Sequence, residues 1–260
     1  MKQITALAFA AILLLPSTAL AQEETDNSKK LKAHVSAALV SKYMWRGQER
    51  GGISIQPEAG ISWRGLSLWA EGNAGFDRDD QEEIDLHLQF ERWGFNIGVT
   101  DYWQTGIDPE GRYFYYDAKN GPHAFEANLG YTFKFASIQA YTVFAGNDFK
   151  INGKRAYSTF IELTVPFRLG GLDWDAKVGI CPMESAGYTY TTTVQGLISE
   201  YTVTNNVYEY GEGFCCNMAS LRATKEFSFK HIKLPVFAEL HTNPYLKKAN
   251  FLVGAQITIF

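Results

Sequence analysis

Residues 84–91 read IDLHLQFE, and every second side chain in this stretch is apolar. The apolar positions run from Ile84 to Phe90 and alternate with polar positions that run from Asp85 to Glu91. Successive side chains of a β-strand point to opposite faces of the sheet. An alternation with a period of two therefore predicts a strand that has one apolar face and one polar face.

The same alternation recurs along the chain, and no stretch after residue 30 has the apolar spacing of an amphipathic helix. A length of about 230 residues is normal for a single all-β barrel domain. The sequence therefore predicts an all-β fold. We expect twelve strands, at residues 31–46, 53–63, 66–76, 83–92, 95–104, 123–133, 137–147, 156–168, 172–181, 218–228, 233–242 and 251–260.

The connections between these segments alternate between short and long. Every second connection holds only a few residues, as in Arg64-Gly65 and Trp93-Gly94. The others are longer and polar, and the longest are residues 105–122 and 182–217. Tight turns at one end and long loops at the other are the layout of a closed antiparallel transmembrane β-barrel.

Residues 1–21 have the features of a secretory signal peptide. Lys2 gives a basic start, an apolar stretch follows, and an A-x-A motif ends at residue 21. We expect cleavage there, a flexible periplasmic leader over residues 22–30, and one barrel domain over residues 31–260. The apolar stretch is too short to cross a bilayer core of about 30 Å as a membrane anchor.

Alternation alone does not say whether the apolar face points inward, as in a soluble barrel, or outward into lipid. Charges in mid-strand, such as Glu71, Asp85 and Glu126, favour the outward arrangement, because a dry core would leave them unsolvated. Aromatic residues near both ends of the segments also match the girdles at two membrane interfaces. They are Tyr43, Trp45, Trp103, Phe144 and Tyr157 at the long-loop ends, and Trp63, Trp93, Phe133, Phe167, Trp174, Phe227 and Phe229 at the short-turn ends.

A sheet that spans lipid must close on itself, because lipid cannot satisfy the backbone groups of a free edge. We therefore expect the last segment, FLVGAQITIF at residues 251–260, to pair with residues 33–45. A strand that ends in Phe260 also resembles the signal by which the outer-membrane assembly machinery recognises its clients. Phe260 is, however, one residue out of phase with the apolar positions Val253 to Ile259.

The first hairpin carries a second resemblance. Residues 37–48 read AALVSKYMWRGQ, and a strand that contains Gln-Pro and an aromatic-rich strand follow. This arrangement resembles the opening of the TorF-type porins over about 45 residues, and the resemblance implies an outer-membrane barrel that acts as a porin, without naming a substrate. The matching positions are Ser41, Tyr43, Arg46, Gly47, Gln56 and Pro57.

A barrel of about twelve strands lies between small filled barrels and large open porins, so a narrow lumen is expected. The polar faces of the segments predict which residues line it, and acids outnumber bases among them. Cations or neutral polar solutes would then pass more readily than anions, unless the charges form a salt-bridged plug. The predicted lining residues are Lys42, Arg46, Glu58, Glu71, Asp85, His87, Glu91, Glu126, Glu162, Asp173, Asp175, Lys177, Arg222, Glu239 and His241.

Other kinds of site find little support in the sequence. Without residues 1–21 the chain loses one of its 24 basic residues and none of its 28 acidic ones, and no basic stripe indicates nucleic-acid binding. No spacing of cysteine and histidine predicts a metal or a cofactor. Cys181 could pair with Cys215 or Cys216, or all three could stay reduced. The acidic residues 77–83 lack the glycine and the spacing of a calcium loop.

An enzyme is not expected, because no histidine falls on the predicted lipid face next to a serine. His87, beside Asp85 and Glu71, could form a charge relay in the lumen. Tyrosines of the loop 182–217 could stack on sugars or could simply belong to an exposed β-ribbon.

The sequence thus predicts a narrow porin-like channel in the cell outer membrane for small polar or cationic solutes. Its expected partners are outer-membrane lipids and lipopolysaccharide, and the assembly machinery. The alternatives are a structural or surface-interaction barrel with an occluded lumen, and a soluble secreted barrel that binds a ligand.

Overall fold

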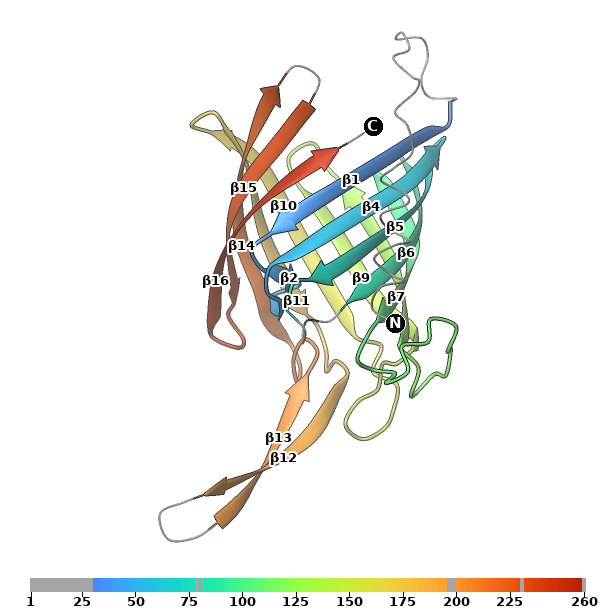
Figure 1. Ribbon diagram of the computed structural model, residues 1–260, viewed down its shortest axis with the longest axis vertical. Helices are drawn as coiled ribbons and strands as arrows, with labels where there is room; N and C mark the ends of the chain where they lie inside the picture. The colour runs from blue at the N-terminus through green and yellow to red at the C-terminus, as the bar shows by residue number, and fades with distance from the viewer. Residues whose placement is uncertain (1–29, 78–79, 81, 196–199, 230–231, 259–260) are drawn as a thin grey trace.

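The computed structural model describes residues 30–77, 80, 82–195, 200–229 and 232–258, and every regular element within them is a β-strand. Twelve strands, each antiparallel to its neighbours, form one closed barrel (Figure 1). The all-β fold and the number of barrel strands are therefore as predicted. The strands are β1 (Lys32–Val40), β4 (Ser54–Trp63), β5 (Leu66–Gly75), β6 (Glu83–Arg92), β7 (Phe95–Gln104), β8 (His123–Thr132), β9 (Ser137–Gly146), β10 (Thr159–Leu169), β11 (Leu172–Cys181), β14 (Cys215–Phe229), β15 (Ile232–Asn243) and β16 (Lys248–Thr258).

The barrel closes where the first strand meets the last. Ser36 to Val40 of β1 pair with Thr258 to Gly254 of β16, which confirms the predicted pairing of the two ends. Phe260, which carries the predicted assembly signal, and the predicted signal peptide lie outside the described residues. Within the described residues no helix is long and apolar enough to cross a membrane.

The short connections are tight because their residues take left-handed backbone angles. Arg64 and Gly65 have φ of 52° and 89°, and Trp93 and Gly94 have φ of 56° and 82°. Two successive positive φ angles are the mark of the type I′ turn, whose twist matches that of the strands that it joins. These turns fix the register of β4 with β5 and of β6 with β7.

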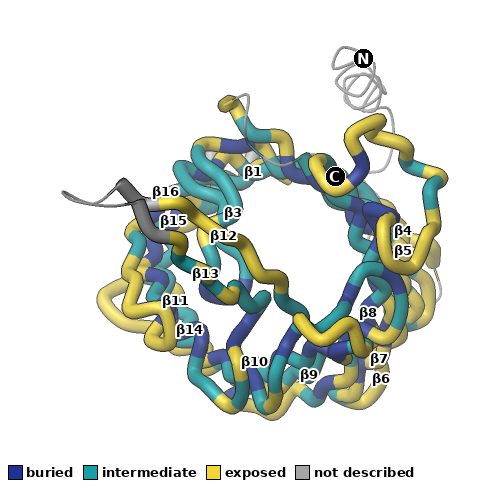
Figure 2. Tube along the Cα trace, turned by 90° about the horizontal axis from the view of Figure 1, so that it is seen from below, coloured by how far each residue is buried: buried dark blue, intermediate teal, exposed yellow. Residues whose placement is uncertain are grey.

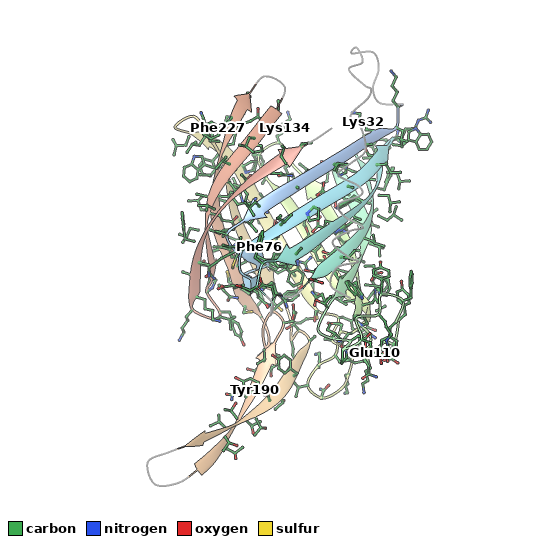
Figure 3. All side chains as sticks on the ribbon, viewed as in Figure 1. Lys32, Phe76, Glu110, Lys134, Tyr190 and Phe227 are labelled. Atoms are coloured by element: carbon green, nitrogen blue, oxygen red, sulfur yellow. The ribbon has the colours of Figure 1, made fainter. Side chains whose placement is uncertain are left out.

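The apolar faces of the strands point outward. Leu86, Leu88 and Leu129 expose 41%, 50% and 58% of their surface, whereas Asp85 and Glu126 inside the barrel expose 4% and 1%. This arrangement is the reverse of a soluble barrel with an apolar core. Seen along its axis, the chain forms a ring (Figure 2), and side chains surround its outer wall (Figure 3).

Five of the seven aromatic residues predicted for the short-turn end are exposed on the outer wall, Trp174 is half-buried, and the side chain of Phe229 lies outside the described part of the structure. Trp63, Phe133, Phe167 and Phe227 are 39–47% exposed there, and Trp93 is 79% exposed. Figure 3 places Phe227 at this end of the barrel.

At the long-loop end the predicted girdle is partly wrong. Phe144 and Tyr157 are exposed, but Trp103 is buried. The loop 105–122 covers Trp103, whose Nε1 donates to the carbonyl of Arg112 at 3.4 Å. Tyr43 and Trp45 lie inside the barrel.

The reason is that the first predicted strand, residues 31–46, is not continuous. β1 ends at Val40, and the Ser41 N–H donates to the carbonyl of Val253 on β16. The chain then turns into the lumen as a separate hairpin of β2 (Tyr43–Trp45) and β3 (Gln48–Gly51).

The longest loop contains a second hairpin. β12 (Gly187–Gln195) and β13 (Glu200–Tyr208) pair with each other and extend away from the barrel (Figure 1). This is the exposed β-ribbon that the sequence offered as one reading, and Tyr188 and Tyr190 are exposed on it. Cys181, Cys215 and Cys216 are all free thiols.

Candidate functional site

The hairpin at residues 43–51, which we call the crossbar, reaches across the lumen. It follows β1, and β9 lies halfway around the barrel from β1. Yet the guanidinium of Arg46 lies 4.1 Å from the ring centre of Tyr141 on β9 and 5.1 Å from that of Phe160 on β10. The crossbar therefore joins opposite walls of the barrel.

A buried ion pair fixes the tip of the crossbar. Arg46 Nη1 and Nη2 donate to the two carboxylate oxygens of Glu126 on β8 at 2.6 and 2.7 Å, and Nη1 also donates to the hydroxyl of Tyr210 at 2.7 Å. Both charged side chains are nearly inaccessible, at 8% and 1% exposure. A bidentate, buried pair of this kind has a defined geometry and is costly to break.

Backbone contacts hold the turn of the crossbar. Arg46 and Gly47 have φ of 46° and 86°, and a Cβ on Gly47 would lie 1.8 Å from the carbonyl oxygen of Asn217. Only glycine fits this close approach. The Gly47 N–H donates to Nε2 of His241 at 3.0 Å, and Nδ1 of His241 is 2.7 Å from Glu239. His241 thus positions the crossbar and serves as more than a lining residue.

Two cavities lie on either side of the crossbar tip. One has a volume of about 530 Å³ and the other about 460 Å³. Trp45 and Tyr102 border both, and their rings meet edge-on with centres 6.0 Å apart. The contact between Trp45 and Tyr102 is therefore part of the partition between the two halves of the lumen.

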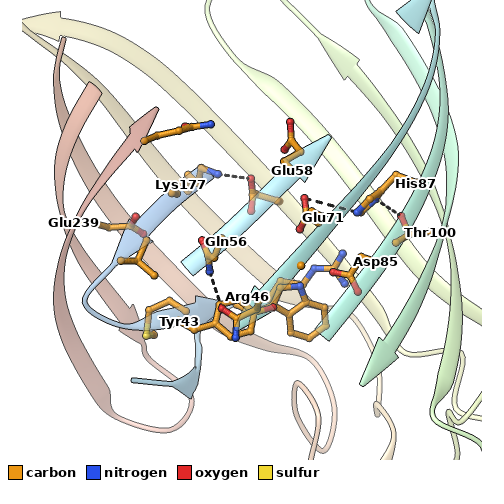
Figure 4. A pocket seen from close by; sticks show the side chains of 18 of the residues that line it. Tyr43, Arg46, Gln56, Glu58, Glu71, Asp85, His87, Thr100, Lys177 and Glu239 are labelled. Atoms are coloured by element: carbon orange, nitrogen blue, oxygen red, sulfur yellow. Dashed lines mark hydrogen bonds and ion pairs between the residues drawn. The ribbon is translucent and has the colours of Figure 1, made fainter. Parts of the chain in front are cut away.

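Most of the residues predicted to line a lumen do border the larger cavity (Figure 4). Glu126 borders the smaller one. The residues on the larger cavity are Lys42, Arg46, Glu58, Glu71, Asp85, His87, Glu162, Lys177, Arg222, Glu239 and His241.

Three predicted lining residues, Glu91, Asp173 and Asp175, border neither cavity. Glu91 and Asp173 are exposed next to short turns, and Asp173 accepts a hydrogen bond from Nε of Arg168 at 2.5 Å. Asp175 lies opposite Arg222 in the register of β11 and β14. Glu91 and Asp173 thus lie next to the short turns and outside the enclosed part of the lumen, whereas Asp175 lies beside Arg222, which does border the larger cavity.

The four basic residues of the larger cavity are each paired with an acid. Lys42 lies 2.6 Å from Glu49, Lys177 lies 3.3 Å from Glu162, Arg222 lies 2.6 Å from Glu239, and Arg46 holds Glu126. On the opposite wall, within the described residues, no lysine or arginine forms an ion pair with Glu58, Glu71 or Asp85. Glu58 instead lies 2.7 Å from Nε2 of His34, and Glu71 lies 3.8 Å from Nε2 of His87.

The sequence prediction missed several aromatic residues in the lumen. Tyr102 lies on the same inward-facing side of β7 as Asn96 and Thr100, so the alternation could have predicted its position in the lumen. Tyr141 borders the larger cavity in the same way. Tyr210 belongs to the long loop after β13, and no pattern in the sequence indicates that it bonds to Arg46.

Several loop carboxylates at the long-loop end have shifted pKa values. Burial raises the pKa of Asp148, which borders the smaller cavity and accepts a hydrogen bond from Ser158 Oγ at 2.5 Å. Hydrogen bonds from Arg112 lower the pKa of Asp108 to about 2. Asp80, from the predicted acidic cluster, accepts from the N–H groups of Gly52 and Asp77.

No protein-family model and no curated protein sequence matches the chain. Among solved structures, Salmonella typhi OmpF in complex with daunomycin aligns over 91% of this chain and 99% of its own length. The identity is 8% and the TM-score is 0.32, which is too distant to indicate a function. The resemblance of the first hairpin to TorF-type porins stays a prediction.

Proposed function

We propose that this protein is an outer-membrane β-barrel that acts as a narrow porin-like channel for small polar or cationic solutes. The observation that carries this proposal is a cavity of about 530 Å³, lined mainly by polar side chains, inside a barrel whose outer wall is apolar. An apolar outer band and a polar, water-accessible interior are what a barrel that spans lipid requires. The resemblance to TorF-type porins supports the same function.

The preference for cations rests on the distribution of charge. Each lysine and arginine of the larger cavity is paired with an acid, while among the described residues Glu58, Glu71 and Asp85 on the facing wall have no lysine or arginine as a partner. A narrow passage with one sign of uncompensated charge raises the local concentration of counter-ions. Small cations would therefore enter more readily than anions.

A structural barrel with an occluded lumen is the second candidate, and the crossbar favours it. Arg46 links the crossbar to β8 and to the long loop through a buried network, so the tip of the crossbar lies across the lumen. In the channel proposal, solutes pass beside this tip. In the alternative, the tip closes the lumen, and the outer surface and loops contact lipopolysaccharide or another partner.

Single-channel recording in planar bilayers separates the two candidates. We expect the folded wild-type protein to give small unitary steps with a reversal potential that shows cation preference. Trp45→Ala should enlarge the steps because Trp45 borders both cavities. Trp93→Ala is the matched control, since this tryptophan is 79% exposed on the outer wall and should leave the steps unchanged.

Correct folding of each sample is checked by heat-modifiable mobility on gels. An absence of steps from correctly folded wild-type protein would overturn the channel proposal and favour the occluded barrel. Solubility of the processed chain without detergent would overturn the membrane location itself.

A further inference from the structure

Three potential metal ligands meet on the acidic wall of the larger cavity. Glu71 on β5 and Asp85 and His87 on β6 each place one ligand atom within 4.8 Å of the other two. Glu71 and Asp85 are direct partners across the two strands, and Figure 4 shows the three side chains side by side. All three border the cavity.

The imidazole of His87 is held in the orientation of a metal ligand. Its ring stacks on Trp69 with centres 4.5 Å apart and an interplanar angle of 4°. Nδ1 lies 2.9 Å from the hydroxyl of Thr100 on β7, while Nε2 has no hydrogen-bond partner in the described part of the chain. When Nδ1–H donates to Thr100, the lone pair of Nε2 is free for a cation, and such outer partners commonly fix metal-binding histidines.

Asp85 provides the second indication of a ligand. It is 4% exposed, and among the described residues its Oδ1 accepts no hydrogen bond. A buried polar atom without a partner is rare in folded proteins and calls for an explanation such as a bound ion. The carboxyl groups of Glu71 and Asp85 face each other directly across the strand pair, and a cation between them would relieve the repulsion of two like charges.

We propose that Glu71, Asp85 and His87 bind one divalent first-row transition-metal ion, of which Zn²⁺ and Co²⁺ are suitable probes. Two carboxylates and one imidazole favour such an ion over Ca²⁺ or Mg²⁺, which prefer all-oxygen sites. Three protein ligands on one wall leave the remaining coordination positions open to the cavity, so the ion exchanges with the lumen.

The geometry needs only a small adjustment to hold the ion. Two ligand atoms that bind one Zn²⁺ at about 2.1 Å each can be at most about 4.2 Å apart. Nε2 of His87 already lies 3.8 Å from Glu71 Oε2. The Glu71 side chain is 46% exposed, so it can move to complete the site while Asp85 and His87 stay fixed.

The test is metal titration of the metal-free, detergent-folded processed protein, with Co²⁺ absorption and Zn²⁺ calorimetry as readouts. The wild-type protein should bind one ion saturably. His87→Gln and Asp85→Asn should each weaken binding at least about tenfold, and Thr100→Val, which removes the hydroxyl beside Nδ1, should weaken it by roughly that amount. Glu91→Gln is the control, because Glu91 is on the same strand but borders neither cavity.

Four outcomes would overturn the site: no saturable binding by the wild-type protein, unchanged binding by His87→Gln, equal weakening by Glu91→Gln, or a thiolate-to-cobalt charge-transfer band that assigns the ion to a cysteine. Gel mobility shows that each variant has folded, and His87→Gln tests the site even when Asp85→Asn does not fold. Binding is measured without a bilayer, so an absence of conductance would overturn the channel and leave this result intact.

Discussion

Arg46 and Glu126 form the most buried charged pair of the lumen, and their coupling can be measured. Removing one partner leaves the other charge unpaired in a closed space, which we expect to cost about 3–5 kcal/mol of unfolding free energy. Arg46→Ala and Glu126→Ala together should cost clearly less than the sum of the two single changes. Reversible urea unfolding in lipid vesicles gives the four values of this double-mutant cycle.

The same cycle distinguishes a specific pair from general loss of packing. Arg46 also lies over the rings of Trp45 and Tyr141, so part of the cost of Arg46→Ala comes from lost contacts with them. Arg46→Met retains most of that volume without the charge. Additive costs in the cycle would show that the ion pair contributes little to the position of the crossbar.

Asp108 in the loop 105–122 gives a prediction of pH dependence. The Arg112 guanidinium donates Nε and Nη2 to its two carboxylate oxygens at 3.0 Å each, which holds the pKa of Asp108 at about 2, below the ordinary 3.8. Because the folded pKa is the lower one, the stabilisation of the loop is complete above about pH 3.8 and is lost as the pH falls through about 2.

An NMR titration of the side-chain carboxyl groups measures the pKa of Asp108 and so checks this prediction. Arg112→Ala should raise the pKa of Asp108 toward 3.8. The pKa of Asp117 in the same loop is lowered by the backbone N–H groups of Asn120 and Lys119, so it should not move. A shift of both carboxylates would mean that the whole loop has rearranged.

At the scale of the elements, the short turns predict a contrast between two glycines. Gly65 and Gly170 both have positive φ, so alanine is strained at either position. A Cβ on Gly65 would also lie 2.3 Å from the carbonyl oxygen of Glu91, whereas nothing lies within 4 Å of a Cβ on Gly170.

Gly65→Ala should therefore lower the unfolding free energy by roughly 1–3 kcal/mol more than Gly170→Ala does. Urea unfolding in vesicles measures both variants under the same conditions. Equal costs would show that the β4–β5 turn can move away from the neighbouring strand and that the backbone angle alone sets the penalty.

The strands could be predicted from the sequence because each has one apolar face on the outer wall and one polar face toward the lumen. The crossbar could not be predicted in this way, since residues 43–46 continue the alternation of β1 and no glycine or proline precedes Gly47 there. Its direction depends on Glu126 and His241, which are 80 and 194 residues away from their partners Arg46 and Gly47. Contacts between residues so far apart in the sequence set the direction of the chain here, and the alternation of apolar and polar residues does not reveal them.

At the scale of the whole molecule, alternation indicates whether a side chain faces the outside or the lumen of the barrel. It does not indicate how far along the barrel axis the side chain lies or which residues are its neighbours. Glu91, Asp173 and Asp175 were assigned the polar phase, yet they lie outside both cavities. The polar phase already suggested His87 beside Asp85 and Glu71, and the structure pairs Glu71 with Asp85, although the seven-residue loop 76–82 does not by itself fix the register of β5 with β6. The two-residue turn after β6, in contrast, already places Asp85 opposite Tyr102.

The outward direction of the apolar face leads to a prediction on two adjacent residues of β6. Leu88 is 50% exposed on the outer wall, and Gln89 borders the larger cavity. In a bilayer, Leu88→Arg should cost about 2–4 kcal/mol of folding free energy because it places a charge in hydrocarbon near mid-strand. Gln89→Arg should cost little, since its side chain faces water and the acids of the lumen. Folding titrations in vesicles measure both changes. A larger cost for Gln89→Arg than for Leu88→Arg would show that the two faces are assigned the wrong way round, and it would contradict the proposed location in a membrane.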